Sequence, residues 1–227
     1  EGGSALSGQL TSTDVDASGS PVYALIGSDI PGLTINADGS WSFDPANVAY
    51  DDLAKDELKT ISVSYSVTDD RGAVDTGTFT INLTGTNDAP EATYTTDLSV
   101  LEGASDASGN ALLLSGQLSA TDVDTDASGL TYMLVADASG NTVDASGNAF
   151  SIDGLSLDSD GSFTFDPTNS AYNYLSEGAT ERITVNYQVA DDESGTSSVE
   201  SFDITVLGTN DGPTATYDAS GLAVIEG

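Results

Sequence analysis

The chain has 227 residues, of which 37 are Asp or Glu and 4 are Lys or Arg, so its formal net charge at pH 7 is −33. So few cationic side chains cannot neutralise a row of phosphates, and no apolar stretch approaches the ~18 residues of a membrane-spanning helix, which excludes nucleic acid, an anionic membrane surface and direct membrane insertion. Cysteine and histidine are absent, which removes disulfides, thiolate metal sites, thiol nucleophiles and the commonest catalytic bases.

The most informative feature of the chain is an internal repeat. Three blocks occur twice and in the same order, at residues 7–10 and 115–118, 39–45 and 161–167, and 85–90 and 208–213. Self-similarity at a long period indicates an array of similar units. The second copy is longer, with insertions near 104–114 and 137–153, which we expect in surface loops because added loop length costs little closure entropy.

The repeat pattern predicts two domains of ~100 residues each, within the usual size of a domain. Residues 1–88 form the first repeat and residues 89–211 the second, and residues 212–227 form a linker and the first strand of a following repeat. Because the pattern runs through both ends, we expect the chain to be a piece of a longer array.

Along the first repeat, apolar and polar side chains alternate in several short segments. Ile61, Val63, Tyr65 and Val67 are separated by serines, and residues 41–43 and 79–83 show the same pattern. Alternation with a period of two is typical of a strand with one buried face.

The second repeat carries the same alternation at the matching positions, residues 163–165, 183–189 and 202–206. Gly, Asp, Asn and Pro separate these segments, and about seven such strands in a unit of ~100 residues are typical of a two-sheet sandwich. The sequence therefore predicts an all-β fold of two antiparallel β-sandwiches in tandem.

The tetrapeptide Asp-Ala-Ser-Gly recurs along the chain. It begins at Asp16, Asp106, Asp126, Asp137, Asp144 and Asp218. An Asp at the start and a Gly at the end favour a tight turn over a dedicated metal loop.

Three acidic motifs recur in the same order in both repeats: an Asp-x-Asp pair, an Asp-Asp pair that ends an apolar segment, and an Asn-Asp pair just before a proline. Their members are Asp14 and Asp16, Asp69 and Asp70, and Asn87 and Asp88 in the first repeat, and Asp122 and Asp124, Asp191 and Asp192, and Asn210 and Asp211 in the second. Each pair taken alone has a second interpretation, respectively a solvated loop, a hairpin turn and a stiff linker.

Calcium chemistry favours an interpretation in which these motifs act together. Ca²⁺ binds six to eight oxygen atoms from carboxylates, amides and backbone carbonyls, and no single motif supplies that number. Several motifs that meet at a junction would do so, and the bound cation would relieve the repulsion among their carboxylates. The sequence thus predicts Ca²⁺ as cofactor, while a surface adapted to a halophilic or marine environment is a second explanation of the charge.

Nearly the whole chain resembles the VCBS and cadherin-like tandem repeats of large bacterial surface proteins, including RTX-type adhesins. The resemblance rests on the run Val67-Thr68-Asp69-Asp70-Arg71-Gly72, on Phe79-Thr80-Ile81, and on Gly85-Thr86-Asn87-Asp88-Ala89-Pro90. It implies Ig-like or cadherin-like Greek-key sandwiches on the outside of a bacterial cell, with Ca²⁺ at the junctions between repeats.

The resemblance also implies a ligand set for the complete junction. The set comprises Glu1, Glu57, Asn87, Asp88, Asp122 and Asp124, together with Asp191 or Asp192. The segment Lys55-Asp56-Glu57 departs from the acidic motif of cadherins, which places Glu57 in question. Two half-sites would remain, one upstream with Asp14, Asp16, Asp69 and Asp70, and one downstream with Glu102, Asn210 and Asp211.

Three classes of function remain to be compared. The resemblance implies a non-catalytic spacer segment of an adhesin, stiffened by Ca²⁺ and serving cell adhesion or biofilm formation, whose partners are the neighbouring repeats of the same chain. The alternative is a Ca²⁺-dependent module that binds a glycan or a surface through the insertion at 137–153, near which only Tyr132 and Phe150 supply aromatic rings. Paired carboxylates can also hydrolyse glycosides, but the pairs lie at expected turns and junctions, so we expect no enzyme.

The two ends of the chain suggest a further partner. Residues 92–101 have the pattern of the first strand of the second repeat, and residues 214–225 repeat that pattern. Nothing equivalent precedes Glu1, so we expect the first repeat to lack this strand. Head-to-tail strand exchange between molecules would supply it.

Overall fold

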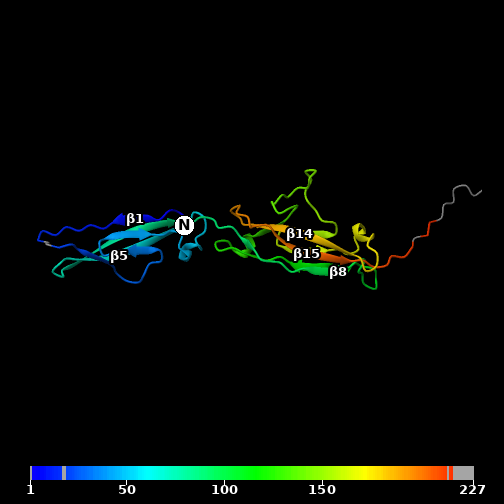
Figure 1. Ribbon diagram of the computed structural model, residues 1–227, viewed down its shortest axis with the longest axis horizontal. Coiled ribbons are helices and arrows are strands. Elements are labelled where there is room, and N and C mark those ends of the chain that lie inside the picture. The colour runs from blue at the N-terminus through cyan, green and yellow to red at the C-terminus, as the bar shows by residue number, and fades with distance from the viewer. Residues whose placement is uncertain (1, 17–18, 214, 217–227) are drawn as a thin grey trace, which may run out of the picture. The chain divides into compact units, whose positions relative to one another are not determined.

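The computed structural model describes residues 2–16, 19–213 and 215–216. It separates into two compact units, each described here by itself. The first unit comprises the described residues within 1–93, 119–132 and 188–198, and the second those within 94–118, 133–187 and 199–227. Strands dominate both units (Figure 1), which confirms the predicted all-β fold.

Two antiparallel three-stranded sheets build most of the first unit. One has the order β1 (Leu6–Gln9), β4 (Ser40–Phe43), β3 (Leu33–Ile35), and the other the order β2 (Val22–Leu25), β5 (Leu58–Thr68), β6 (Val74–Thr84). The long β5–β6 hairpin pairs in register from Leu58 opposite Thr84 to Thr68 opposite Val74. A short antiparallel pair joins β7 (Glu91–Ala92) to β10 (Ala120–Thr121).

The core of the first unit follows from the alternation in its strands. Its buried side chains are Phe43, Tyr50, Leu53, Val63, Ile81 and Leu83. Val63 on β5 and Ile81 on β6 point into this core, while the serines between the apolar residues of β5 remain partly or fully exposed. Tyr50 belongs to a short 3₁₀ helix (Val48–Tyr50) that the Asn47 side chain caps by accepting from the Ala49 N–H.

The second unit has a four-stranded and a three-stranded sheet. The order of the first is β11 (Thr131–Val135), β14 (Thr180–Ala190), β15 (Glu200–Leu207), β8 (Leu98–Leu101), in which β8 runs parallel to β15. The order of the second is β12 (Leu155–Leu157), β13 (Ser162–Phe165), β9 (Leu114–Gln117). Within the described residues, two further 3₁₀ helices occur, Ala127–Gly129 in the first unit and Ser170–Tyr172 in the second.

The Asp-Ala-Ser-Gly copies that lie within the described residues, at Asp106, Asp126, Asp137 and Asp144, all form the predicted turn, in which the Gly N–H donates to the Asp carbonyl. The copies at Asp16 and Asp218 include residues outside the described ranges. Asp106 Oδ1 accepts hydrogen bonds from the N–H groups of Ser108 and Asn110, and Asp144 Oδ1 accepts from those of Ser146 and Asn148. The glycines that close these two turns have φ of 82° and 81°, a conformation that only glycine adopts readily. The copy at Asp126 differs, because it precedes the 3₁₀ helix and makes no capping hydrogen bond with its side chain.

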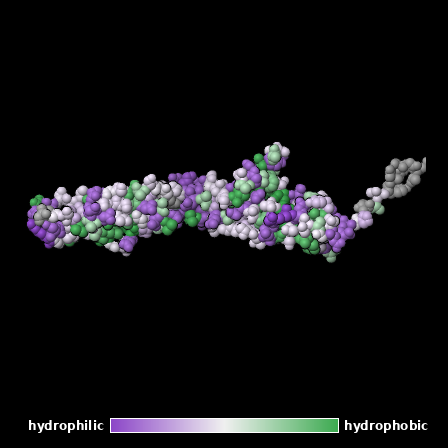
Figure 2. All heavy atoms as spheres, in the orientation of Figure 1, coloured by the Kyte–Doolittle hydropathy of each residue, from purple (hydrophilic) through white to green (hydrophobic). Residues whose placement is uncertain are grey.

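The surface of the units is mixed rather than uniformly polar. Hydrophilic residues occupy much of the visible face of each unit, with apolar residues between them (Figure 2). Within the described residues, no helix is long and apolar enough to cross a membrane.

Candidate cation site in the acidic loops

The first unit brings three of the acidic motifs together. Asn87 and Asp88 follow β6, Asp122 and Asp124 follow β10, and Asp191 follows β14. We call these five residues the acidic cluster. The Asn87 Nδ2 donates to Asp191 Oδ2 at 2.8 Å, and the Asp88 N–H donates to Asp124 Oδ2 at 3.2 Å.

Local hydrogen bonds fix the loops that carry these carboxylates. Asp122 Oδ1 accepts from the N–H groups of Asp124 and Thr125, both at 3.1 Å. Asp191 Oδ1 accepts at 2.8 Å from the N–H groups of Glu193 and Gly195. In each case one carboxylate oxygen shapes its own loop, which leaves the second oxygen for another partner.

Three oxygen atoms of the acidic cluster are buried without a hydrogen-bond donor. They are Asn87 Oδ1, Asp122 Oδ2 and Asp124 Oδ1. A buried acceptor without a partner costs about 1–3 kcal/mol, and more when it is charged. Carboxylate and amide oxygens are the ligands of hard divalent cations, so these atoms fit a bound Ca²⁺.

The electrostatics of the cluster agree with this interpretation. Burial and, after it, the neighbouring carboxyl of Asp122 raise the pKa of Asp124 to about 6, against the opposing effect of the hydrogen bond from the Asp88 N–H. The protein thus disfavours the ionised form at this position when no cation is present. A bound cation would reverse that preference.

Asp192 and Lys55 lie beside the acidic cluster. Asp192 Oδ1 accepts from Thr125 Oγ1 at 3.4 Å. A cavity of about 310 Å³ is lined by Asn87, Asp124 and Asp192 and also by Lys55 and Glu193. Lys55 Nζ is 2.7 Å from Glu193 Oε2, which places a cationic side chain next to the carboxylates.

Sequence reasoning did not identify Lys55 and Glu193, because 138 positions separate them along the chain. The available signal was the departure of Lys55-Asp56-Glu57 from an all-acidic motif. The predicted ligand Glu57 closes its own turn instead, where its Oε2 accepts from the Ala54 N–H at 3.3 Å. Among the described residues, no group of three or more acidic side chains is arranged so that it could hold a metal ion. The side-chain oxygen of Asn87 is the one buried acceptor without a donor in the acidic cluster that is not a carboxylate oxygen.

The predicted upstream half-site is held by internal contacts. Asp14 Oδ1 accepts from the Asp16 N–H at 3.1 Å, and Arg71 forms an ion pair with Asp16 at 2.9 Å. Asp69 Oδ1 accepts at 2.8 Å from the N–H groups of Arg71 and Ala73, which lowers the pKa of Asp69. Asp70 contacts the loop at Gly19.

The predicted downstream residues lie in the second unit. Glu102 is buried, with 3% of its surface exposed, and its Oε2 accepts from the Thr209 N–H at 3.1 Å. Asn210 and Asp211 are exposed. Glu1, the proposed early glutamate, lies outside the described residues, as do residue 214 and residues 217–227 of the expected third-repeat strand.

Solved structures similar to this chain include fragments of cadherins and protocadherins. Human CDH23 EC21-23 matches with a TM-score of 0.48 and 18% identity, over 88% of this chain and 66% of that chain. Mouse Cadherin-23 EC22-24 gives a TM-score of 0.45 at 14% identity, over 83% and 53%, and Protocadherin Gamma B7 domains 1-4 give 0.43 at 18%, over 82% and 41%. The chain therefore spans between about two fifths and two thirds of the length of these structures.

Comparison with protein families and with curated proteins gave one match. No curated protein matches the chain. A protein-family model does match, over residues 1–82, and that family is described as a bacterial Ig domain. The match coincides with most of the first predicted repeat and, together with the all-β structure, supports an Ig-like or cadherin-like repeat.

Proposed function

We propose that the chain is a non-catalytic spacer segment of a bacterial cell-surface adhesin, in which Ca²⁺ bound by the acidic cluster stiffens the connection between consecutive repeats. The observation that carries the proposal is the set of three buried acceptor atoms without donors, on Asn87, Asp122 and Asp124. These atoms come from the linker and from a loop of the second predicted repeat. One cation bound to both would tie the two stretches of chain together.

The residues that would hold the ion can be named. Asn87, Asp122 and Asp124 would offer their unpaired oxygens, and Asp191, already hydrogen-bonded to Asn87, would add its carboxylate. Bound Ca²⁺ supplies positive charge that offsets the repulsion among these groups. Asp88 contributes through its backbone, because its N–H orients Asp124.

The family match supports a structural role outside the cell. Bacterial Ig and cadherin-like domains are typically structural or adhesion modules rather than enzymes, and are usually extracellular. Extracellular modules bind Ca²⁺ with a Kd of about 10⁻⁴–10⁻³ M, a useful range where Ca²⁺ is millimolar. At a concentration of about 100 times Kd, a site present only in the folded state adds about 2.7 kcal/mol to its stability.

Isothermal titration calorimetry tests the site. We expect Ca²⁺ to bind the native chain and the variant Asp122→Asn to bind at least about tenfold more weakly, because it loses one ligand charge. Asp106→Asn is the matched control, since Asp106 lies in an exposed turn and belongs to no proposed site. Absence of Ca²⁺ uptake by the native chain, or equal binding by both variants, would contradict the assignment.

The alternative of a ligand site on the insertion at 137–153 gains no support from the structure. Two of its three acidic side chains are engaged in their own turns, where Asp137 accepts from Ser139 and Asn141 and Asp144 accepts from Ser146 and Asn148. We therefore assign no binding function to this loop.

A further inference from the structure

The side-chain amide of Asn87 has one orientation that its neighbours allow. Its Nδ2 donates to Asp191 Oδ2 and to the Asp88 carbonyl, both at 2.8 Å. A carboxylate and a carbonyl oxygen only accept hydrogen bonds, so the NH₂ end of the amide must face them. The other end, Oδ1, is therefore held on the far side of the amide, where it is one of the three buried acceptors without a donor.

Asp191 is itself held in place. It is buried, with 7% of its surface exposed. Its Oδ1 accepts from the N–H groups of Glu193 and Gly195, which leaves Oδ2 as the atom that meets Asn87. The Asp191 N–H closes the same turn by donating to the Gly195 carbonyl at 3.1 Å. Asp191 thus sets the direction of the Asn87 amide.

Gly195 makes the approach of these two side chains possible. A Cβ atom on Gly195 would overlap Asp191 Oδ2 and would lie 2.6 Å from Asn87 Nδ2. Non-bonded heavy atoms rest at about 3.5–4.0 Å from each other, and hydrogen bonds fix both of these side chains. Any other residue at this position would therefore push Asn87 and Asp191 apart.

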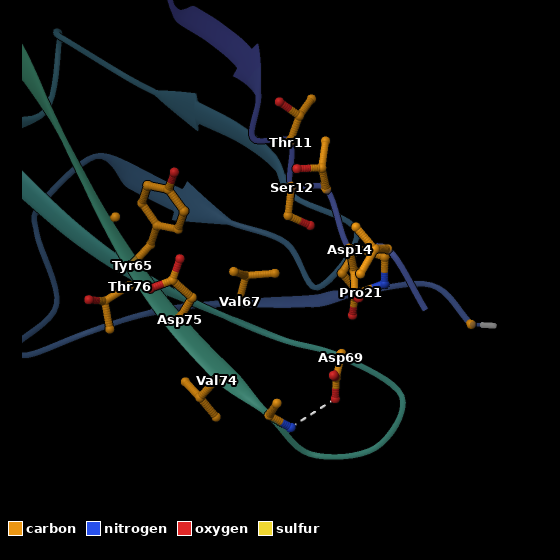
Figure 3. Close-up of a pocket in the computed structure, with 15 residues that line it drawn as sticks. Thr11, Ser12, Asp14, Pro21, Tyr65, Val67, Asp69, Val74, Asp75 and Thr76 are labelled. Atoms are coloured by element: carbon orange, nitrogen blue, oxygen red, sulfur yellow. Dashed lines mark hydrogen bonds between the residues drawn. The ribbon is translucent and has the colours of Figure 1, made fainter. Parts of the chain in front are cut away.

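The corresponding turn of the first repeat shows that the turn itself does not require this glycine. Asp69 Oδ1 accepts at 2.8 Å from the N–H groups of Arg71 and Ala73, and Figure 3 draws the second of these bonds as a dashed line. Ala73 occupies the position that matches Gly195, so the same turn forms with a side chain there. The glycine of that turn is Gly72, one position earlier, where φ is 88°.

In the second repeat, a serine occupies the position that has the left-handed backbone. Ser194 matches Gly72 and has a φ of 76°. Residues with a Cβ rarely adopt this conformation, whereas glycine adopts it readily. The second turn thus has its glycine where a Cβ would collide with Asn87 and Asp191, and keeps an unfavourable backbone at Ser194. Backbone strain that the surrounding structure maintains is a pointer to function.

We propose that Gly195 is a positioning residue of the cation site, because it lets Asp191 orient the Asn87 amide so that Oδ1 faces the ion. The inference rests on the proposed function, since a reversed amide would present its NH₂ donors to the cation in place of an oxygen ligand. Both backbone groups of Gly195 are bonded to Asp191. Its effect on Ca²⁺ binding therefore passes through the side chain of Asn87.

Nuclear magnetic resonance of the ¹⁵N-labelled full chain in excess chelator tests the positioning without any metal. The NH₂ signals of Asn87, assigned by their loss in Asn87→Asp, should exchange slowly with solvent in the native chain, because that group donates two hydrogen bonds. In Gly195→Ala the exchange should be at least about tenfold faster, since the bond to Asp191 is lost. Calorimetry of the same variant should show Ca²⁺ binding at least about tenfold weaker than in the native chain.

The double variant Ser194→Gly, Gly195→Ala separates positioning from folding of the turn. It restores the order of glycine and alanine of the first repeat, so the backbone strain is relieved, yet the added methyl group still displaces Asn87. We expect it to keep the fast exchange and the weak Ca²⁺ binding of Gly195→Ala. Gly116→Ala is the matched control for general destabilisation, because its methyl group meets Phe163 in the second unit, and both readouts should stay native.

The two measurements fail in different ways. Native exchange of the Asn87 amide in Gly195→Ala, or recovery of slow exchange and Ca²⁺ affinity in the double variant, would overturn the positioning role. A native chain that binds no Ca²⁺ would overturn the proposed function, whereas the exchange in chelator judges the orientation of Asn87 alone.

Discussion

At the scale of single residues, the acidic cluster buries carboxylate groups whose ionised form burial disfavours. One carboxylate oxygen of Asp124, Oδ2, accepts a hydrogen bond from the Asp88 N–H. The other, Oδ1, is buried without a hydrogen-bond donor, and the carboxyl of Asp122 is its neighbour. Both features disfavour the ionised form. Protonation of Asp124 would remove this cost, and so would the metal ion proposed above.

The response to protons gives a pH prediction. The pKa of Asp124 is raised from 3.8 to about 6 in the folded chain, so the folded state holds a proton that the unfolded state releases. This contribution to stability is complete below pH 3.8 and is lost as the pH rises to about 6, by an amount on the order of 1–3 kcal/mol. In excess chelator, thermal unfolding should occur at a higher temperature at pH 4.5 than at pH 7.

The variant Asp124→Asn separates this effect from the general repulsion among carboxylates. Because an amide does not titrate, the difference in melting temperature between pH 4.5 and pH 7 should shrink. A variant with the same pH dependence as the native chain would show that another group is responsible.

Lys55 gives a second prediction at this scale. Its ammonium group lines the same cavity as Asn87 and Asp124, and its pKa is raised chiefly by Glu193, with smaller effects from Asp56 and Asp191. A fixed positive charge at this place should oppose the binding of a divalent cation. We expect Lys55→Gln to increase Ca²⁺ affinity by about two- to tenfold in calorimetry.

Stability should change little in Lys55→Gln, because the ion pair with Glu193 is about half exposed and exposed ion pairs contribute little to stability. Lys59→Gln is the matched control, since the Lys59 ammonium lies 5.3 Å from the centre of the Tyr50 ring and lines no part of this cavity. An unchanged or lower affinity in Lys55→Gln would count against a competing role for the lysine.

At the scale of elements, the strands were the most predictable part of the chain. The alternation at residues 61–67 and 183–189 corresponds to β5 and β14, and the Asp-Ala-Ser-Gly turns at Asp106 and Asp144 form as expected. Both signals are local, since a strand face repeats every two residues and a turn needs four. The contact of Lys55 with Glu193 carries no local signal and required the structure.

In two of the three-stranded sheets, β1-β4-β3 and β12-β13-β9, a glycine packs against an aromatic ring, a contact that the sequence pattern did not reveal. Gly8 on β1 and Gly116 on β9 lie beneath the rings of Trp41 and Phe163 on the neighbouring strands. A methyl group at either glycine would collide with the ring. In both copies of the Ser-Gly-Gln-Leu block, the glycine therefore leaves room for an aromatic side chain of the neighbouring strand.

We expect Gly116→Ala to destabilise the fold by about 1–3 kcal/mol, because Phe163 is 2% exposed and has little room to move. Chemical denaturation measures this difference. Gly212→Ala is the matched control, since an added methyl group there contacts nothing within 4 Å. Equal stability of the two variants would contradict the tight packing of Phe163 on Gly116.

At the scale of the whole molecule, the internal repeat produces corresponding features in both copies. In each copy an aromatic side chain of one sheet packs on one of the other sheet, Trp41 on Phe79 and Phe163 on Phe202. Along the sequence, the Asn-Asp pair of the first copy comes shortly before the Asp-x-Asp pair of the second. In the structure the two pairs meet, since the Asp88 N–H donates a hydrogen bond to Asp124. The resemblance placed these motifs at one junction, whereas the unpaired oxygens and the position of Lys55 depend on side-chain positions that the sequence does not give.

The central claim, that Ca²⁺ stiffens the connection between repeats, is tested most directly by small-angle X-ray scattering of the same sample with Ca²⁺ and then with excess chelator, at concentrations where the chain is monomeric. We expect a narrow, extended particle with Ca²⁺ and a broader ensemble after chelation, and the Asp122→Asn, Asp124→Asn double variant should resemble the chelated state even with Ca²⁺ present. Scattering profiles that coincide in all three conditions, together with no Ca²⁺ uptake in calorimetry, would contradict the claim and identify the acidic motifs as turns and solvated surface.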